Sequence, residues 1–308
     1  MKFSKISVII VTYNAMKWAE RCFSSLRKSS VPVEVIVVDN GSTDGTQEYI
    51  QTHFPEVDFT QSSENLGFGK ANNLGIEKAY KNGADFFYLM NQDAWIFEDS
   101  IQKMLDVYKE YPNKNEIGIL SPMHLDGTEN NLDIFLDKYI ATNFEKTRLI
   151  SDLFCQNIKE SYEISFVNAA HWLLPKSTIE TVGGFNPYFF HYGEDNEYVN
   201  RVHFHKKKIL LCTKSKVVHD GKQMLNKVNY QLFKDLSIET KIMSPALENS
   251  FKQEKSALIQ SMIKNISLGQ WTNFKSSFAK FQKISQEKEQ LIQLKKQIQQ
   301  KGLTFLKP

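Results

Sequence analysis

Three short polar segments follow apolar runs in the first third of the chain, and their side chains could bind one ligand together. The segments are Thr12-Tyr13-Asn14, Asp39-Asn40-Gly41-Ser42 and Asn91-Gln92-Asp93. The carboxylate of Asp39 can accept hydrogen bonds from a base N–H group or from ribose hydroxyls. Asp93, with amide oxygens beside it, suits a hard divalent cation that bridges a diphosphate. Such an ion neutralises the charge on a departing nucleoside diphosphate.

Two acids stand side by side in the later segment Gly193-Glu194-Asp195-Asn196-Glu197, and Arg201 follows about one helical turn further on. One of these acids could act as a general base that takes the proton from an attacking hydroxyl group. The alternative is a capping role, because acidic side chains at the start of a helix are stabilised by the helix dipole.

His219 comes directly after the apolar pair Val217-Val218. Imidazole is a common ligand for Mn²⁺-like ions, although a lone histidine is more often structural. Its place after a strand, downstream of the acid pair, favours the ligand role. Asp93 and, separately, His219 are therefore candidate ligands of a divalent cation such as Mg²⁺ or Mn²⁺.

Alternating strands and helices are predicted between these segments. Strands are expected at 6–11, 33–38, 86–90 and 117–120, and helices at 17–28, 43–53, 70–81 and 99–111. Ser42 or Thr43 is the expected N-cap of the second helix. This alternation predicts an α/β fold with a mostly parallel, Rossmann-like sheet flanked by helices. The carboxyl ends of its strands would then place the three polar segments on one rim.

The rest of the chain divides into an irregular part, a late α/β part and a helical part. Residues 124–163 are expected to be irregular, 165–174 and 208–218 to be strands, and 177–182 and the end of 191–205 to be helical. From about residue 225 glycine becomes scarce, and Ile284, Leu291 and Ile298 repeat every seven residues. We expect a catalytic domain over 1–224 and a helical extension over 225–308. The extension could pack on the domain, form a homodimer or dock on a membrane surface.

Composition excludes several classes of protein. A formal net charge of +3 over 308 residues offers no dense basic face for nucleic acid. Cys22, Cys155 and Cys212 are far apart and include no CxxC pair, which argues against a zinc knuckle or a disulfide framework. No apolar run approaches the length of a membrane-spanning helix. We expect a cytoplasmic protein, either free or peripheral on the inner face of the cell membrane.

In order, these motifs resemble those of family 2 glycosyltransferases with the GT-A fold, and specifically the bacterial rhamnosyltransferase-like branch. The resemblance runs from about Ile6 to Gly221. It rests on Val11-Thr12-Tyr13-Asn14, Val38-Asp39-Asn40-Gly41-Ser42-Thr43-Asp44-Gly45, Asn65-Leu66-Gly67-Phe68-Gly69-Lys70-Ala71-Asn72-Asn73-Leu74-Gly75, Asn91-Gln92-Asp93, Gly183-Gly184-Phe185, Gly193-Glu194-Asp195 and His219. Any one motif is weak evidence, but the ordered set is specific.

The resemblance implies a role for each matching residue. It places the donor nucleotide against Thr12, Tyr13, Asn14, Asp39, Asn40, Asn65, Gly67, Asn73 and Gln92. It makes Asp93 and His219 the metal ligands and Asp195 the catalytic base, with Glu194 beside the base and Arg201 orienting the site. The implied reaction is an inverting, metal-dependent transfer of a sugar from a nucleoside-diphosphate donor, with UDP or dTDP as the expected carrier. The acceptor would be a hydroxyl group of a glycan or a lipid-linked molecule in bacterial surface polysaccharide synthesis.

Two departures from the family pattern and two rival functions accompany this prediction. Gln92 stands where the branch often has proline, and His171-Trp172 belongs to a segment that often reads Gly-Ala. Trp172 could therefore contact a sugar or belong to the core. The rival functions are a polyprenyl-phosphate glycosyltransferase, which shares the fold, and a catalytically silent sugar-nucleotide-binding scaffold.

Overall fold

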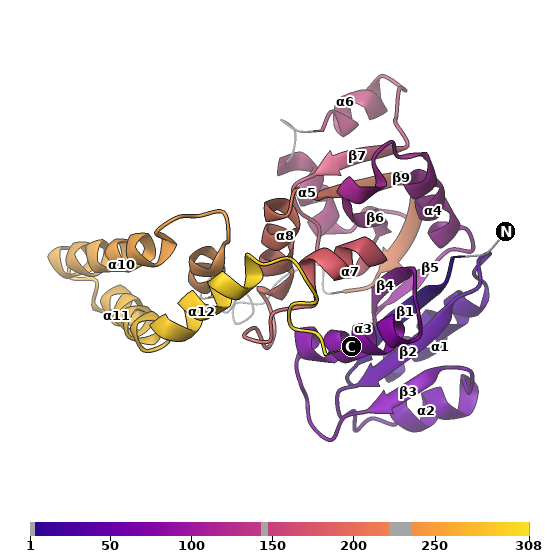
Figure 1. Ribbon diagram of the computed structural model, residues 1–308, viewed down its shortest axis with the longest axis horizontal. Helices are drawn as coiled ribbons and strands as arrows, with labels where there is room; N and C mark the ends of the chain where they lie inside the picture. The colour runs from indigo at the N-terminus through magenta and orange to yellow at the C-terminus, as the bar shows by residue number, and fades with distance from the viewer. Residues whose placement is uncertain (1–3, 143–146, 222–235, 308) are drawn as a thin grey trace.

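The computed structural model describes residues 4–142, 147–221 and 236–307 and contains a nine-stranded mixed sheet in the order β3-β2-β1-β4-β8-β6-β9-β5, with β7 also paired to β9 (Figure 1). Strands β3, β2, β1 and β4 run parallel, while β8 enters antiparallel between β4 and β6. The strands are β1 (Ile6–Thr12), β2 (Glu34–Asp39), β3 (Asp58–Gln61), β4 (Phe86–Asn91), β5 (Ala94–Ile96), β6 (Ile117–Leu125), β7 (Ser161–Ile164), β8 (His171–Pro175) and β9 (Lys208–His219).

Helices cover both faces of this sheet, because alternate strand residues point to opposite sides. On β1, Val8 and Ile10 pack with residues of α1, α2 and α4, whereas Ile9 packs with residues of α3, α7 and α8. The helices are α1 (Met16–Arg27), α2 (Thr46–His53), α3 (Phe68–Lys81), α4 (Ser100–Glu110), α5 (Ile134–Thr142), α6 (Leu149–Phe154), α7 (Lys176–Val182), α8 (Glu194–Phe204), α10 (Ser250–Ser267), α11 (Trp271–Gln286) and α12 (Lys288–Ile298), with a 3₁₀ turn at Lys114–Glu116.

The strand register brings the predicted polar segments to one rim. Thr12 pairs with Asp39, and Val11 pairs with Asn91 on the other side of β1. The parallel arrangement of the first strands is therefore as the sequence predicts. On the far side of the sheet β9 runs parallel to β6, and its last residue, His219, pairs with Ala94 of β5.

Several local predictions were wrong. Residues 124–163 are not simply irregular, since they contain the end of β6, helices α5 and α6, and β7. The expected strand 165–174 is shorter and is β8. Helix α2 begins at Thr46 after a left-handed Gly45, and neither Ser42 nor Thr43 caps it. The Ser42 hydroxyl instead accepts a hydrogen bond from the Asn14 amide at 2.9 Å.

The C-terminal helices form their own small core and return the chain to the sheet. Ile284, Leu291 and Ile298, the predicted heptad positions, are buried in this core together with Phe189. The final segment then lies against the turn after α7, where the amide of Gly184 donates to the Thr304 carbonyl at 2.8 Å. The predicted boundary at 224/225 falls outside the described residues. No helix in the described ranges is long and apolar enough to span a bilayer.

Close packing of α3 on β1 gives a test of this architecture. A Cβ added to Gly75 would collide with Cγ2 of Ile9. We expect Gly75→Ala to lower the free energy of unfolding by about 1–3 kcal/mol, although alanine is otherwise the better helix residue. Urea denaturation measures the change. Leu74→Ala, at an exposed position of the same helix, is the control and should stay within about 0.5 kcal/mol. A more stable Gly75→Ala protein would contradict this packing.

Candidate active site

Asp39 is a fully buried carboxylate at the end of β2, and it organises the loops around it. Its Oδ1 accepts from the Thr12 hydroxyl at 3.2 Å, and its Oδ2 accepts from the Ser42 amide at 2.9 Å and from Gln47 Nε2 at 3.2 Å. A carboxylate offers about four acceptor positions. With three donors in place, Asp39 keeps capacity for a donor group on a ligand.

The loops after β1 and β4 are tied together by Gln92. Its Oε1 accepts from the Tyr13 amide at 2.6 Å, and its Nε2 donates to the Tyr13 carbonyl at 3.1 Å. Asn14, which has a positive φ of 52°, accepts from the Thr43 amide at 2.9 Å. The glutamine at the usual proline position thus braces the Tyr13 main chain, while the Tyr13 side chain is 47% exposed.

Asn40, Asn65 and Gly67 form a second braced loop next to Asp39. Asn40 accepts from the Leu66 amide at 3.2 Å and donates to the Gly67 carbonyl at 3.4 Å. Asn65 accepts from the Gly67 amide at 2.9 Å. Gly67 has a φ of 81°, and a Cβ there would collide with the Phe190 carbonyl. This loop therefore holds Asn40 in place and approaches the segment that precedes the acid pair.

Asn73 and Arg201 do not face the rim; both form hydrogen bonds with the turn at 183–185. The Asn73 amide group donates to the Phe185 carbonyl at 2.8 Å and accepts from the Phe185 amide at 2.7 Å. The wholly buried Arg201 donates to the Gly184 carbonyl at 2.7 Å and pairs with Glu197 at 3.0 Å. Both side chains are engaged with protein groups, so they influence the site through the turn that they position.

His219 lies between two carboxylates. Its Nδ1 is 3.1 Å from Asp133 Oδ2, and its Nε2 is 3.7 Å from Asp93 Oδ1. Because a carboxylate can only accept, Nδ1 carries a hydrogen, and Nε2 is the nitrogen that faces Asp93. A carboxylate behind a histidine ligand fixes its tautomer and direction in many metal sites. Asp133, which is 1% exposed, fits this supporting position.

The electrostatics around His219 follow from these contacts. Burial lowers the pKa of His219, but the hydrogen bond to Asp133 and the charges of the nearby carboxylates outweigh it, so the pKa is raised above its usual value. Burial raises the pKa of Asp133, but the hydrogen bond and charge of His219, together with the amides of Leu136 and Phe135, outweigh it, so the pKa is lowered. Near this pair, Oδ1 of Asn91 is buried and no donor in the described ranges reaches it.

The acid pair begins α8 after Gly193, which has a positive φ of 92°. Asp195 accepts from the Asn196 amide at 2.7 Å, whereas Oε2 of the buried Glu194 has no hydrogen-bond partner among the described residues. Burial raises the pKa of Asp195, and burial together with the charge of Asp195 raises the pKa of Glu194. These carboxyls thus hold protons more tightly than exposed acids do.

Tyr139 lies on α5, the helix that begins directly after Asp133. Burial, and then the charges of Asp195 and Asp133, raise the pKa of Tyr139.

Asp133 and Tyr139 were not predicted from the sequence. Asp133 accepts from the amides of Phe135 at 2.8 Å and Leu136 at 3.1 Å, so it caps α5. An aspartate three residues before Leu136 could have been predicted from the sequence as the N-cap of a helix. That signal identifies a helix start and gives no hint of a contact with His219.

His171 and Trp172 are both fully buried and are not exposed to a donor sugar. His171 Nδ1 lies 2.7 Å from the Tyr88 hydroxyl, and Trp172 stacks on Phe185 with ring centroids 6.0 Å apart. Trp172 therefore belongs to the core, which resolves the alternative left open by the sequence.

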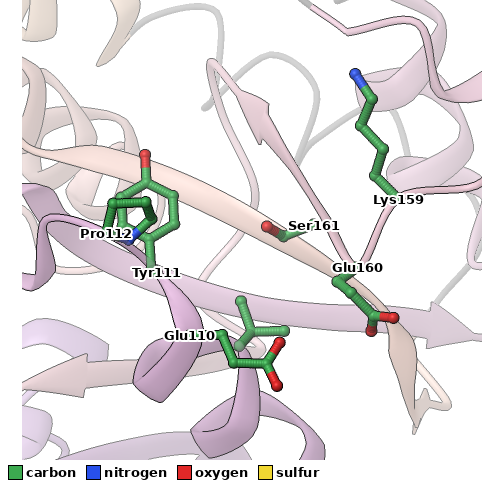
Figure 2. Close-up of a pocket in the computed structure, with 7 residues that line it drawn as sticks. Glu110, Tyr111, Pro112, Lys159, Glu160 and Ser161 are labelled. Carbon is green, nitrogen blue, oxygen red and sulfur yellow. The ribbon is translucent and has the colours of Figure 1, made fainter.

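A separate pocket of about 250 Å³ lies at another part of the molecule (Figure 2). It is lined by the end of α4 and the start of β7, with Tyr111 and Pro112 facing Glu160 and Ser161 across it. It contains none of the predicted site residues, so it is distinct from the rim described above.

Comparison with known proteins shows which family the sequence matches. The family model "Glycosyl transferase family 2" matches residues 7–164. An N-acetylglucosaminyl-diphospho-decaprenol L-rhamnosyltransferase of Mycobacterium tuberculosis is 33% identical over 124 residues, covering 37% of this chain and 40% of the relative. The putative teichuronic acid biosynthesis glycosyltransferase TuaG of Bacillus subtilis is 32% identical over 140 residues, or 44% of this chain and 52% of the relative.

Solved structures support the same fold at low sequence identity. TarS 1-349 of S. aureus in complex with UDP-GlcNAc superposes with a TM-score of 0.54 at 16% identity, covering 94% of this chain and 83% of that one. This similarity establishes the GT-A fold, with its mixed sheet between helices and a helical C-terminal region. The matched part spans about half or less of the curated relatives.

The Asp133–His219 contact gives a second test. Asp133→Asn retains a side chain that can cap α5 and accept from His219, but it removes the negative charge. We expect the pKa of His219 to fall by about one unit or more. Titration of the imidazole C2–H resonance by NMR measures it, with His219→Gln to assign the signal. Asp137→Asn, at an exposed position of the same helix, should leave the pKa unchanged. An unchanged or higher pKa in Asp133→Asn would refute the assigned contact.

Proposed function

The chain belongs to glycosyl transferase family 2, and we propose that it transfers a sugar from a nucleoside-diphosphate donor to an acceptor hydroxyl group with inversion at the anomeric carbon. The observation that carries this proposal is the placement of Asp39 and Asp93 at the ends of β2 and β4 on one rim of the sheet, with His219 at 3.7 Å from Asp93, while Asp195 begins α8. Each stands at a strand end or helix start where it can reach a ligand outside the sheet.

The donor nucleotide would lie along the ends of β1 and β2. Asp39, held by Thr12 and Ser42, retains an acceptor position for a base N–H group or a ribose hydroxyl. The exposed ring of Tyr13 is available to lie against the base. Because TarS, which has the same fold, was solved with UDP-GlcNAc, UDP is the first carrier to test, followed by dTDP.

The donor set at Asp93 and His219 fits a divalent cation. One carboxylate and one imidazole face each other here at 3.7 Å, and the side-chain nitrogen of Asn91 lies 3.5 Å from the same imidazole, although no group of three His, Cys, Asp or Glu side chains is arranged for a metal in the described residues. Mg²⁺ commonly takes one or two carboxylates and completes its shell with substrate phosphates and water. A bound Mg²⁺ or Mn²⁺ would supply neutralisation of the diphosphate charge. Asp93 and neutral His219 would hold it, and Asp133 would orient His219.

Asp195 would act as the general base. The acceptor oxygen forms a bond to the anomeric carbon, the bond from that carbon to the diphosphate oxygen breaks, and the acceptor proton passes to Asp195. One displacement inverts the anomeric centre and needs no nucleophile from the protein. Burial suits Asp195 to this role, because the raised pKa makes it a stronger base than an exposed carboxylate. Glu194, whose pKa is raised further, would donate a hydrogen bond while protonated.

The biological setting follows from the relatives, which include proteins named for rhamnosyl transfer to a lipid-linked sugar and for teichuronic acid synthesis. We propose a glycan or lipid-linked acceptor in bacterial surface polysaccharide synthesis. In this proposal residues 1–224 form the catalytic domain and 225–308 the extension, which contacts a membrane or a second copy. A polyprenyl-phosphate acceptor is the second candidate, favoured by the exposed apolar side chains of α10 and α11. The silent-scaffold alternative has little support, because the acid pair and Asp93 are both in place.

A thermal-shift screen tests the donor site first. UDP, dTDP and GDP would each be added with Mn²⁺, Mg²⁺ or EDTA. A ligand that binds only the folded state at a concentration 100 times its Kd stabilises that state by about 2.7 kcal/mol. We expect one nucleotide to raise the Tm when metal is present, and to raise it by less when EDTA removes the metal. Equal shifts with metal and EDTA would contradict the metal-dependent site.

Two substitutions separate binding from chemistry. We expect Asp195→Asn to lower kcat by about 10²–10⁴-fold while leaving the nucleotide-dependent Tm shift intact. Asp39→Asn should instead weaken that shift. Radiolabelled sugar transfer measures the rates, and Asp152→Asn on the distant helix α6 is the control. Full transfer activity in Asp195→Asn would exclude this residue as the base.

The pH dependence follows from the same group. The base acts only when it is ionised, and burial raises the pKa of Asp195. As the pH falls, activity should therefore be lost at a higher pH than the usual range of an aspartate. A kcat/KM profile between about pH 5 and 8, recorded at saturating Mn²⁺, measures this limb. A flat profile over the range would argue against a buried carboxylate base.

A further inference from the structure

The outer half of the hairpin formed by α10 and α11 carries large apolar side chains on its surface. Their exposed fractions lie between 40% and 63%, for Ile259, Ile263, Ile266, Leu268, Trp271 and Phe278. The apolar core that the hairpin shares with the other C-terminal helices lies at its base, where Leu258 and Ile284 are buried. Figure 1 shows the hairpin reaching away from the sheet. These side chains therefore serve neither that core nor the active-site rim.

The inner side of the hairpin is marked by polar contacts. The hydroxyls of Ser261 and Ser277 are 3.0 Å apart, and Asn265, which is 8% exposed, donates to Ser261 at 3.3 Å. In its outer half, α10 and α11 thus meet through small polar side chains. The apolar side chains of the same half must then lie on other faces of the helices.

Each helix carries those apolar side chains as one stripe. The stripe of α10 consists of Ile259, Ile263 and Ile266, and that of α11 consists of Trp271, Phe274 and Phe278. The aromatic rings form a continuous ladder, with centroids 6.2 Å apart for the first pair and 6.0 Å for the second. At about 100° per residue, each stripe is rotated about its helix axis by roughly a third of a turn from the face that meets the other helix. Because the helices are antiparallel, these offsets bring both stripes to the same side of the hairpin.

The charged side chains of the outer half of the hairpin are all positive. Between Glu254 and Glu287 the chain has five lysines and no acidic residue. Lys283, near the base, pairs with Glu239 at 2.7 Å. Lys264 and Lys275 lie exposed on the outer half, where the sequence offers no carboxylate. At about 100° per residue, Lys275 lies within a quarter turn of the stripe on α11, whereas Lys264 lies more than a third of a turn from the stripe on α10. The outer half is thus positively charged, with Lys275 beside its apolar face.

We propose that the outer half of the α10–α11 hairpin docks on the surface of an anionic phospholipid bilayer. The two stripes would enter the boundary between headgroups and acyl chains, where tryptophan is favoured, and Lys275 would face lipid phosphates, with Lys264 adding to the positive charge of the hairpin. A second copy of the chain fits less well, because pairing two such faces would bring lysines of one sign together. The inference concerns where the protein acts and is independent of which sugar it transfers.

Cosedimentation of the whole protein with lipid vesicles tests the proposal. We expect binding to vesicles of phosphatidylcholine mixed with phosphatidylglycerol, little binding to phosphatidylcholine alone, and release by salt. The double substitution W271S/F278S should lower the partition coefficient at least about tenfold. Lys275→Gln should lower it about fivefold, and Lys264→Gln, on the side of α10 away from the stripe, should lower it less. Phe154→Ser is the matched control, since Phe154 on α6 is 88% exposed and distant from the hairpin.

A spectroscopic measurement reports on the same contact. Trp271 is 62% exposed, so its fluorescence should shift to shorter wavelength on anionic vesicles, and Trp271→Phe should remove this shift. Failure of the whole protein to bind anionic vesicles, or equal binding by W271S/F278S, would overturn the proposal. So would a dimer in analytical ultracentrifugation that W271S/F278S abolishes while vesicle binding stays unchanged. If W271S/F278S keeps the nucleotide-dependent rise in Tm, its loss of vesicle binding does not come from damage to the donor site.

Discussion

The parallel pairing of β1 with both β2 and β4 is the constraint on which the rest of the site depends. It sets Thr12 beside Asp39 and Val11 beside Asn91, so three loops leave the sheet at the same edge. A slip of one residue in either pairing would turn the strand's side chains to the opposite face. The apolar residues that alternate along β1 prevent this slip, because each face already packs against its own helices.

The other half of the site depends on contacts between segments far apart in the chain. His219 arrives at the rim because β9 pairs with β5, and the Asp220 amide then donates to the Asp93 carbonyl at 2.8 Å. Asp133 approaches the same histidine from the start of α5. The three side chains come from separate elements, yet each is fixed by main-chain pairing or helix capping. Their arrangement therefore costs little side-chain entropy when a ligand arrives.

The sequence predicted those features that depend on short-range pattern. The apolar runs, the polar strand ends and the ordered motifs indicated the parallel strands, the rim and the family, and these were confirmed. The antiparallel entry of β8 and the joining of Asp133 to His219 depend on tertiary pairing between distant segments, which one sequence does not encode locally. Asn73 and Arg201 show the same limit. The resemblance placed Asn73 at the donor site and gave Arg201 an orienting role, but both side chains are buried and their hydrogen bonds go to the turn at 183–185. The assigned roles of the rim residues remain predictions.

The C-terminal region is structurally continuous with the acid pair, and this bears on how the extension acts. Phe189 belongs to the core formed by the C-terminal helices, and a Cβ on Gly193 would meet its ring. Gly193, the N-cap of α8, therefore rests on that core. At the other end of the extension, the Thr304 carbonyl accepts from Gly184 and Leu306 packs beside the same turn. The C-terminal extension thus contacts the segment that leads to Asp195 at both ends, near Gly184 and near Gly193. A membrane contact at the hairpin would consequently orient the base candidate with respect to the bilayer, because close-packed elements transmit position with little compression.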